Sequence, residues 1–414
     1  MNQFFLIDEK RNISVSWEQF VCELSDANEY YPYVMEASPY NIFKQIVLSL
    51  LASEPITILD SDLRNEELAN LGYTHDQFLS TTKINFPSVP NAEELIKMIS
   101  GRADGWAMTL YTSGTTGLPK KVEHTFQSLT RWVRLDENRK EDIWGFAYNP
   151  THMAGLQVFF QALLNLNTIV YLFGNSRDEI FDSIDRMQVT NISATPTFFR
   201  LLMPVERTFT SVKKITTGGE KFDIRLKSDL AQLFPQSKVR NVYASTEAGS
   251  LFSAGGDVFT ISPVLESLIK IKDGELLIHG SLLGYSESLL LKDGWYYSGD
   301  LVEIVSTDPV SFRFIHRKND LINVGGYKVN PAEVEEMLNA HESIKIAKVY
   351  GRPNSVMGTI LCCDIVLNDG LSLTVSQIRE YLGKRLQPFK VPRIVNFTDR
   401  IETTRTGKIK RNQE

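Results

Sequence analysis

The sequence has few cysteines and no long uninterrupted apolar run. Its 414 residues include only Cys22, Cys362 and Cys363. Three cysteines are too few for a disulfide scaffold, and none lies in a C-x-x-C pair, so we expect a reducing compartment and no zinc site. The most apolar stretches, 41–52 and 158–173, are interrupted by polar residues and fall short of the roughly 20 apolar residues that a bilayer span needs. The first ten residues meet charge too early for a secretory signal, which predicts a soluble, cytoplasmic protein.

The composition is that of an ordinary globular protein. Hydrophobic residues make up 43% of the chain and charged residues 23%, with 25 glycines and 16 prolines. These proportions exclude a mainly disordered, collagen-like or coiled-coil chain. Because domains usually contain about 100–200 residues, the length predicts two or more domains, each large enough to bury a core.

Charge is distributed unevenly along the chain. Residues 317–414 contain 16 basic and 11 acidic side chains, a net charge of +5, whereas residues 1–316 carry a net charge of −11. A basic C-terminal part indicates an anionic partner. Charge alone leaves three interpretations open, namely a nucleic acid, a phosphorylated small molecule held between two domains, or chance.

Alternating strand and helix patterns predict an α/β fold for the larger part of the chain. Such alternation is typical of parallel strands in layered sheets. From about Gly274, short strands with tight turns follow, which predicts an antiparallel β unit. The strand patterns lie at 56–59, 108–111, 168–173, 191–194 and 239–243, and the helical patterns between them at 39–52, 180–187 and 224–233.

The last hundred residues have a pattern of their own. A Gly-Gly turn is followed by Pro331, which opens an amphipathic helix over 332–338, and then by a strand pair and another helix. We therefore predict a large N-terminal domain of layered α/β sheets plus a β unit, residues 1–318, and a small α+β C-terminal domain, residues 319–414.

A segment rich in glycine and hydroxyl side chains directly follows a predicted strand. It reads Thr112-Ser113-Gly114-Thr115-Thr116-Gly117-Leu118-Pro119-Lys120-Lys121. Its backbone N–H groups and hydroxyls are free to surround an anion, and its lysines add positive charge. The spacing differs from G-x-x-x-x-G-K-[ST], so the segment is not a Walker A loop and a P-loop kinase loses most of its support.

This segment resembles the signature loop of the acyl-adenylate-forming superfamily, which comprises acyl- and aryl-CoA synthetases, adenylation domains of peptide synthetases and beetle luciferase. The resemblance covers about residues 105–411 and implies that the C-terminal domain is mobile. Four further motifs match in the expected order, namely Tyr243-Ala244-Ser245-Thr246-Glu247, Tyr297-Ser298-Gly299-Asp300, Arg317 through Gly325-Gly326-Tyr327-Lys328 to Glu335, and Thr404-Arg405-Thr406-Gly407-Lys408.

The resemblance implies a nucleotide site. Tyr243 would stack on adenine, Asp300 would accept both ribose hydroxyls, and Arg317 would reach the ribose or the phosphates. The base edge would be lined by Gly218, Gly219 and Glu220. The β- and γ-phosphates would be covered by a loop that contributes Thr112, Ser113, Gly114, Thr115, Thr116, Gly117 and Lys120.

The resemblance also implies which residues perform catalysis. A carboxylate brought against a negative α-phosphate needs donors and cations where charge develops. Thr246 would donate to the α-phosphate and Glu247 would hold Mg²⁺. Lys408, which considered alone would be a solvated surface lysine, would be carried into the active site to neutralise both anions together.

Further positions would serve the mobile domain and its acceptor thiol. The hinge of the family corresponds to Asn319, where many relatives have Asp or Lys, and a hinge needs to absorb a backbone change rather than to carry charge. The channel for a pantetheine arm would be lined by Gly325, Gly326 and Lys328, because glycine permits close backbone approach.

The segment that starts at His152 resembles the acyl-site motif of the family. His152 and Gly155 are therefore candidates for the acyl pocket, with a purely structural histidine as the alternative, and they precede an apolar helix predicted over 156–166. Amino-acid-activating relatives place an Asp shortly after this point, whereas residues 156–160 contain no acid. This favours an aryl or aliphatic carboxylic acid. Only about a hundred residues precede the phosphate loop, which we interpret as a shortened N-terminal region.

The resemblance thus implies an AMP-forming acid–thiol ligase. With ATP and Mg²⁺ it would convert a carboxylic acid into an acyl-AMP, release pyrophosphate, and transfer the acyl group to a pantetheine thiol, with CoA as the expected acceptor. Two alternatives stay open, a ligase that loads a phosphopantetheinyl carrier protein and a non-catalytic nucleotide-binding relative. Retention of Lys408, Glu247 and Asp300 argues against the second. No nucleic-acid partner is expected, because the chain is acidic overall and has no recognised binding motif.

Overall fold

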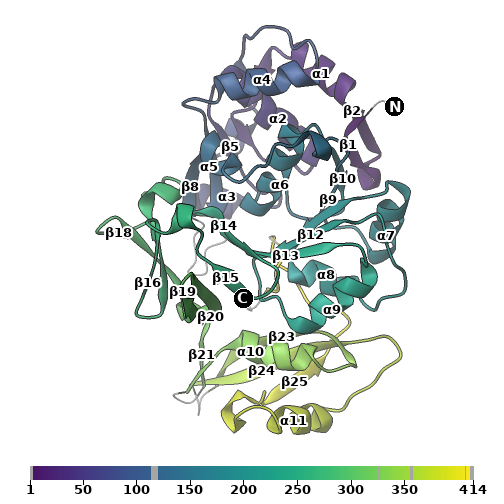
Figure 1. Cartoon of the computed structure of the whole chain (residues 1–414), viewed down its shortest axis with the longest axis vertical. Coiled ribbons are helices and arrows are strands. Elements are labelled where there is room, and N and C mark those ends of the chain that lie inside the picture. Colours follow the sequence, from purple (N-terminus) through teal and green to yellow (C-terminus); the bar gives the residue numbers. More distant parts are fainter. Residues whose placement is uncertain (1–2, 113–119, 325–326, 355–357, 406, 411–414) are drawn as a thin grey trace.

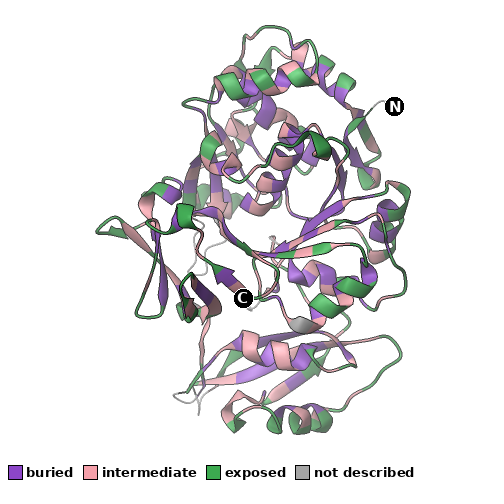
Figure 2. Cartoon of the chain, viewed as in Figure 1, coloured by how far each residue is buried: buried purple, intermediate pink, exposed green. Residues whose placement is uncertain are grey.

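The computed structural model describes residues 3–112, 120–324, 327–354, 358–405 and 407–410. It confirms the predicted mixed α/β fold, with a large body formed by the N-terminal and central parts of the chain and a small body formed by the C-terminal part (Figure 1). Buried residues run through the sheets of both bodies, and exposed residues cover their outer helices (Figure 2). In the part of the chain that the structure describes, no helix is long and apolar enough to cross a membrane.

An eight-stranded sheet forms the centre of the large body. Its order is β14-β13-β12-β11-β9-β10-β1-β2, and the six inner strands are parallel. The carboxyl ends of parallel strands meet at one edge, where ligands bind in open α/β sheets. The strands are β1 (Phe4–Asp8), β2 (Ile13–Ser16), β9 (Ile143–Phe146), β10 (Thr168–Tyr171), β11 (Asn191–Ala194), β12 (Lys214–Gly218), β13 (Lys238–Ser245) and β14 (Gly249–Ala254), and the helices between them are α6 (Met153–Leu164), α7 (Arg177–Arg186), α8 (Pro196–Leu201) and α9 (Ile224–Leu233).

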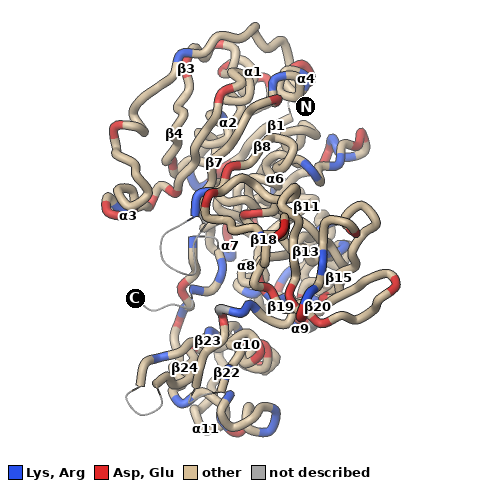
Figure 3. The backbone as a smooth tube through the Cα atoms, turned by 90° about the vertical axis from the view of Figure 1, so that its left-hand side faces the viewer, with Lys and Arg blue, Asp and Glu red and all other residues tan. Residues whose placement is uncertain are grey.

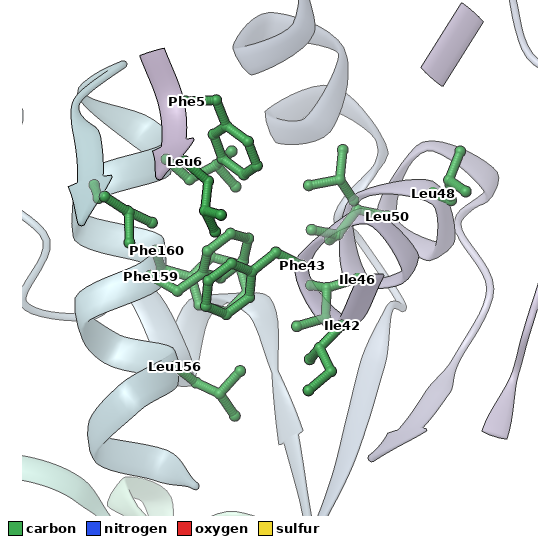
Figure 4. Close-up of a cluster of buried hydrophobic side chains, with 14 of the residues drawn as sticks. Phe5, Leu6, Ile42, Phe43, Ile46, Leu48, Leu50, Leu156, Phe159 and Phe160 are labelled. Atoms are coloured by element: carbon green, nitrogen blue, oxygen red, sulfur yellow. The ribbon is translucent and has the colours of Figure 1, made fainter. Parts of the chain in front are cut away.

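A smaller four-stranded sheet, in the order β4-β5-β7-β8, packs with helices from the first part of the chain. Helix α2 joins it to the central sheet, since Phe43 stacks on Phe159 of α6 with ring centroids 4.2 Å apart (Figure 4). Its strands are β4 (Tyr33–Val34), β5 (Ile56–Ile58), β7 (Ala107–Thr112) and β8 (Lys120–Thr125), while β3 (Glu29–Tyr30) and β6 (Thr82–Lys83) form a separate two-stranded sheet. The helices are α1 (Trp17–Ser25), α2 (Pro39–Ala52), α3 (Asn65–Asn70), α4 (Ala92–Arg102) and α5 (Phe126–Thr130).

The predicted antiparallel β unit is confirmed as a six-stranded sheet in the order β15-β20-β19-β17-β16, with β18 paired to β19. Its strand β19 is longer than the short strands that the sequence predicts, and its partner β20 ends at Arg317. The strands are β15 (Val258–Thr260), β16 (Ile269–Lys272), β17 (Glu275–His279), β18 (Leu291–Lys292), β19 (Trp295–Thr307) and β20 (Val310–Arg317).

The C-terminal body has a hydrophobic cluster of its own, formed by residues between Val324 and Val395. Three of its lysines form ion pairs within the body, Lys348 with Asp364, Lys384 with Glu380 and Lys390 with Glu333. Basic residues are spread over the whole chain rather than gathered on one face (Figure 3). The elements are β21 (Ile322–Val324), β22 (Tyr327–Val329), α10 (Pro331–Asn339), β23 (Ile344–Asn354), β24 (Gly358–Leu367), α11 (Val375–Gly383) and β25 (Ile394–Phe397).

Local sequence signals account for most helix boundaries. Ser38 caps α2 and Pro39 occupies its first turn, which fixes the start that the sequence predicts. The helix expected over 156–166 begins earlier, at Met153, and ends at Leu164, because Leu166 has a left-handed backbone with φ 55°.

Candidate active site

The carboxyl ends of four strands of the central sheet border one cavity. Segments that follow β9, β11, β12 and β13 come together there with one face of α6, as the parallel topology requires. The cavity has a volume of about 280 Å³. Its described lining residues are Leu129, Trp132, Val133, Trp144, Tyr148, Asn149, His152, Met153, Ala154, Gln157, Val158, Gln161, Ser193, Thr195, Thr216, Thr217, Gly218, Gly219, Val242, Ala244, Ser245, Thr246, Ser250 and Lys408.

The C-terminal segment reaches this cavity through backbone hydrogen bonds. Thr195, the N-cap of α8, accepts a bond from the N–H of Phe198 and donates its hydroxyl proton to the carbonyl of Gly407, 2.9 Å away. Glu220 accepts the N–H of Ile409 at 3.1 Å through Oε1 and the N–H of Thr197 at 2.9 Å through Oε2. Residues on both sides of Lys408 are therefore anchored to the ends of two central strands.

An ionic cluster anchors the same segment from the other side. Arg405 Nε lies 2.8 Å from Asp62 Oδ1, and its Nη1 lies 3.2 Å from Glu67 Oε1. Asp62 lies in the segment after β5, and Glu67 lies in α3. Burial opposes the charge of Arg405, but Glu67 and Asp62 raise its pKa. The pKa of Glu67 is lowered by the backbone N–H of Arg64 and by Arg405. The cluster joins the C-terminal segment to the N-terminal part of the chain.

Lys408 lines the cavity beside Gly219, one of the residues predicted for the nucleotide site. A Cβ atom added at Gly219 would lie 2.8 Å from Lys408 Cε and 3.3 Å from its Nζ. Gly219 has φ 82°, a left-handed conformation that glycine adopts without strain. Burial lowers the pKa of Lys408 and outweighs the opposing attraction of Glu220. The ammonium thus depends on a glycine for its space and loses part of its hydration.

Tyr243, Asp300 and Arg317 form a connected group. Asp300 is buried and accepts the hydroxyl of Tyr243 at 2.6 Å and Arg317 Nε at 2.7 Å. Burial and the Asp300 carboxylate raise the pKa of Tyr243, while Asp300 raises that of Arg317 against the effect of burial. The Tyr243 ring stacks on Phe314 with centroids 4.4 Å apart, so Phe314 covers one of its faces.

The turn that carries Thr246 and Glu247 is held through its carbonyl groups. His124 Nε2 lies 2.7 Å from the carbonyl oxygen of Thr246, and the N–H of Gly284 donates to that of Glu247 at the same distance. Burial lowers the pKa of His124 to about 4 despite the hydrogen bond to Thr246, so the ring is neutral at pH 7 and Nε2 donates. Two partners far apart in sequence therefore orient one turn.

The donor set at Glu247 fits Mg²⁺. Its carboxylate forms no hydrogen bond or ion pair with another described residue, and it follows a residue that lines the cavity. Mg²⁺ is commonly held by one or two carboxylates together with substrate phosphates. In the described part of the chain no group of three His, Cys, Asp or Glu residues could hold a metal ion alone. Glu247 would therefore need phosphate oxygens to complete the coordination.

The predicted phosphate loop connects the two strands of a hairpin. Thr112, the last residue of β7, pairs with Lys120, the first residue of β8. Ser113, Gly114, Thr115, Thr116 and Gly117 lie outside the described residues, as does the side chain of Thr112. The hairpin adjoins the β unit, since Glu123 forms an antiparallel bridge with Tyr285.

The two acyl-pocket candidates differ in position. His152 lines the cavity, and its Nε2 lies 3.3 Å from Oδ2 of Asp60. Burial opposes the charge of Asp60, but His152, Thr151 and Asn149 together lower its pKa to about 2. Gly155 is not among the described lining residues; a Cβ there would lie 2.5 Å from the carbonyl oxygen of Asn149, so this glycine permits close packing of α6.

The hinge and channel candidates lie after β20. Asn319 falls in the 3-10 helix η6 (Lys318–Asp320), and its side chain is outside the described part. Lys328 is exposed on β22. Gly325 and Gly326 are not among the described residues. Their proposed functions stay predictions.

The sequence pattern did not indicate several residues that shape the site. Asp60, His124, Thr195 and Gln157 belong to none of the family motifs. Thr195 could have been found as the threonine before a proline at a helix start, a strong N-cap signal. The others act through partners 89 to 122 residues away, for which a single sequence contains no local signal.

Family models match both bodies. The model described as AMP-binding enzyme matches residues 46–277, and the model described as AMP-binding enzyme C-terminal domain matches residues 333–408. Among curated relatives, 2-succinylbenzoate–CoA ligase of Bacillus subtilis (strain 168) is 28% identical, with 78% of this chain and 71% of the relative covered. Feruloyl-CoA synthase of an Amycolatopsis species is also 28% identical, with 74% of this chain and 68% of the relative covered.

Solved structures with the same fold cover nearly the whole chain. The o-succinylbenzoate CoA synthetase from Bacillus subtilis, in complex with its acyl-adenylate intermediate, has a TM-score of 0.70 at 21% identity, covering 100% of this chain and 95% of that one. ATP-bound MatB from Rhodopseudomonas palustris has a TM-score of 0.73 at 18% identity, covering 99% and 94%. These findings confirm the resemblance indicated by the motifs. Because the first family model spans more than half of the residues, the chain belongs to the AMP-binding enzyme family.

Proposed function

We propose that this AMP-binding enzyme is an acid–thiol ligase that activates a carboxylic acid as its acyl-AMP and transfers the acyl group to CoA. The observation that carries the proposal is the position of Lys408, which comes from the C-terminal segment yet lines the same cavity as Thr246 and His152. A protein that only bound a nucleotide would not need an anchored ammonium there. The CoA ligases among its relatives support the choice of acceptor.

In the proposed first step, a carboxylate oxygen attacks the α-phosphorus of ATP and pyrophosphate leaves with the electrons of the broken P–O bond. Lys408 neutralises the two approaching anions, and the hydroxyl of Thr246 donates to the α-phosphate. Mg²⁺, when bound with ATP at Glu247, supplies charge neutralisation for the phosphates. His124 keeps the Thr246–Glu247 turn in position through its hydrogen bond to the carbonyl oxygen of Thr246.

The nucleotide is assigned to the residues around Asp300. Tyr243 and Arg317 already hold this carboxylate, which orients it for the ribose hydroxyls. In the proposed second step, the CoA thiolate attacks the acyl carbonyl carbon and AMP leaves. Asn319 is proposed as the hinge between the steps, and the channel for the pantetheine arm is assigned to Gly325, Gly326 and Lys328.

Pyrophosphate release in the presence of ATP and Mg²⁺ tests the proposal across a panel of carboxylic acids, with and without CoA. Acid-dependent release followed by a thioester on CoA, identified by mass spectrometry, would support it. If release depends on the acid but the acyl group appears on a phosphopantetheinyl carrier protein and not on CoA, the carrier protein replaces CoA as the proposed acceptor. If no acid in the panel causes release, the chain is a nucleotide-binding relative without ligase activity.

A further inference from the structure

The walls of the cavity are mainly apolar and aromatic. Trp144 and Tyr148 are buried, and the indole N–H of Trp144 is already bonded to Asn167. Flat rings favour a flat, apolar ligand, because stacked or edge contacts add to the burial of its surface. The side chains that provide these walls are Leu129, Trp132, Val133, Trp144, Tyr148, Met153, Ala154 and Val158.

Positive charge in the cavity is limited to the end where the adenylate would form. Among the described lining residues, Lys408 is the sole Lys or Arg, and His152 faces the carboxylate of Asp60. Arg131 lies near the cavity in sequence, but its guanidinium donates to the carbonyls of Ala248 and Leu282. Residues 113–119 contain no charged side chain in the sequence. A second carboxylate on the substrate would therefore be buried without a cation, which is strongly unfavourable.

One pair of polar groups faces the apolar walls. Gln157 lies one helical turn after Met153 on α6, and its Oε1 accepts the hydroxyl of Ser250 at 2.8 Å. Gly249, with φ 66°, leaves room for the amide, since a Cβ there would lie 2.9 Å from Gln157 Nε2. Within the described residues, the Gln157 Nε2 group has no hydrogen-bond partner.

The pair is complementary to a hydroxyl group. With Gln157 Oε1 bound to Ser250, the amide N–H groups can donate and Ser250 Oγ can accept. If the amide is turned over, Ser250 donates and Gln157 Oε1 accepts, so either orientation offers one donor and one acceptor. A substrate hydroxyl needs both, whereas a carboxylate can only accept. Gln161, one turn further along α6, differs because both its amide atoms bond to the backbone of Arg134.

We infer that the acid activated here is an aromatic monocarboxylic acid with a hydroxyl substituent, which the Gln157–Ser250 pair recognises. The inference rests on the proposed ligase function and adds the class of its substrate. Gln157 and His152 both line the cavity, Gln157 from within α6 and His152 from its N-cap position. The 2-succinylbenzoate named for one relative carries a second carboxylate, and this cavity is expected to reject such acids.

The test compares matched acids by kcat/KM for pyrophosphate release. Benzoic and cinnamic acids are each used without a ring substituent, with a 3- or 4-hydroxyl, and with a 4-carboxylate. We expect kcat/KM for the better hydroxylated acid to be at least about 10-fold higher than for its unsubstituted parent and at least about 100-fold higher than for the dicarboxylic acid. A site built for a hydroxyl discriminates strongly against analogues that leave its polar groups unpaired.

Two variants locate the recognition. Gln157→Leu should bring the ratio of kcat/KM for the hydroxylated acid to that for the unsubstituted acid to within about 3-fold of unity. Gln161→Leu is the matched control, and it should keep the preference, since its amide is engaged by the backbone. Thermal unfolding checks that both variants are folded, and Ser250→Ala provides a second, smaller change to the same pair.

The outcomes separate this inference from the proposed function. Equal activity on dicarboxylic and hydroxylated acids, release with aliphatic acids alone, or an unchanged preference in both Gln157→Leu and Ser250→Ala would overturn the inference while the ligase assignment stands. Absence of release with every acid would reject the ligase itself.

Discussion

Replacing Lys408 by alanine should nearly abolish adenylation and spare thioester formation. The ammonium lies beside Gly219 in a partly buried position, where two opposite charges about 4 Å apart attract by about 4 kcal/mol at an effective dielectric constant of 20. Loss of one positioned donor in a transition state typically costs about 2.7–4 kcal/mol, or a factor of 10² to 10³ in rate. We therefore expect pyrophosphate release to slow by two to three orders of magnitude.

The second half-reaction distinguishes a catalytic loss from a folding defect. The Lys408→Ala variant should convert synthetic acyl-AMP and CoA into thioester at nearly the wild-type rate. In this step negative charge develops on the carbonyl oxygen of the acyl group rather than around the phosphorus. Lys410→Ala removes an ammonium two residues away and serves as the matched control. Pyrophosphate release that persists in Lys408→Ala would refute the assignment.

The pH profile of the same reaction follows from the burial of Lys408. Its pKa is lowered by burial, so the protonated form required for adenylation is lost as pH rises, at a lower pH than for an exposed lysine. The rate of adenylation should therefore decrease at alkaline pH, which gives the pH profile a descending alkaline limb. In Lys408→Arg the limb should vanish, because a guanidinium does not titrate in this range, even if the rate is lower.

Three further changes probe the support of the site. Gly219→Ala places a Cβ against Lys408 and forces an alanine into φ 82°, so we expect adenylation to fall at least 10-fold while thioester formation from acyl-AMP is kept; normal pyrophosphate release would contradict the position of the lysine. Asp60→Asn removes the partner of His152 and should raise KM for the acid and lower the free energy of unfolding by about 1–3 kcal/mol at pH 7, measured by denaturant titration. Because the pKa of Asp60 is lowered to about 2, this contribution is present above the ordinary aspartate pKa and disappears as pH falls towards 2. Glu67→Gln weakens a partly exposed ion pair worth about 0.2–1 kcal/mol, so adenylation should slow by less than about 5-fold and become less sensitive to salt. Unchanged salt dependence would argue against a role for the cluster with Arg405.

The sequence was most informative where function depends on short contiguous motifs. Alternation of strands and helices predicts the layered fold, and the order of the motifs predicts that Thr246, Asp300 and Lys408 serve one site. Parallel topology explains why Gly219 and Thr246, which lie just after β12 and β13, border the same cavity. The predicted helix over 39–52 agrees with α2 because its cap and its proline are local signals.

The sequence was least informative where a polar side chain supports a motif from a distance. His124 holds the Thr246 carbonyl across 122 residues, and Asp60 binds Asn149 across 89. No periodicity or spacing relates such pairs. Glu220 shows the same limit in another form, because its position in the motif is local but its two hydrogen bonds, to Thr197 and Ile409, depend on tertiary structure.

The way in which Lys408 is held is suited to reversible docking. The flanking residues Gly407 and Ile409 are bound through a carbonyl and an N–H, each contact contributing about 0.5–1.5 kcal/mol net, and the Arg405 cluster adds a similar amount. Such contacts are directional, so they can position an ammonium accurately. They are also polar, so undocking would exchange them for hydrogen bonds with water. The proposed departure of this domain after adenylation would require contacts of this kind, because a large apolar interface would oppose the separation of the two bodies.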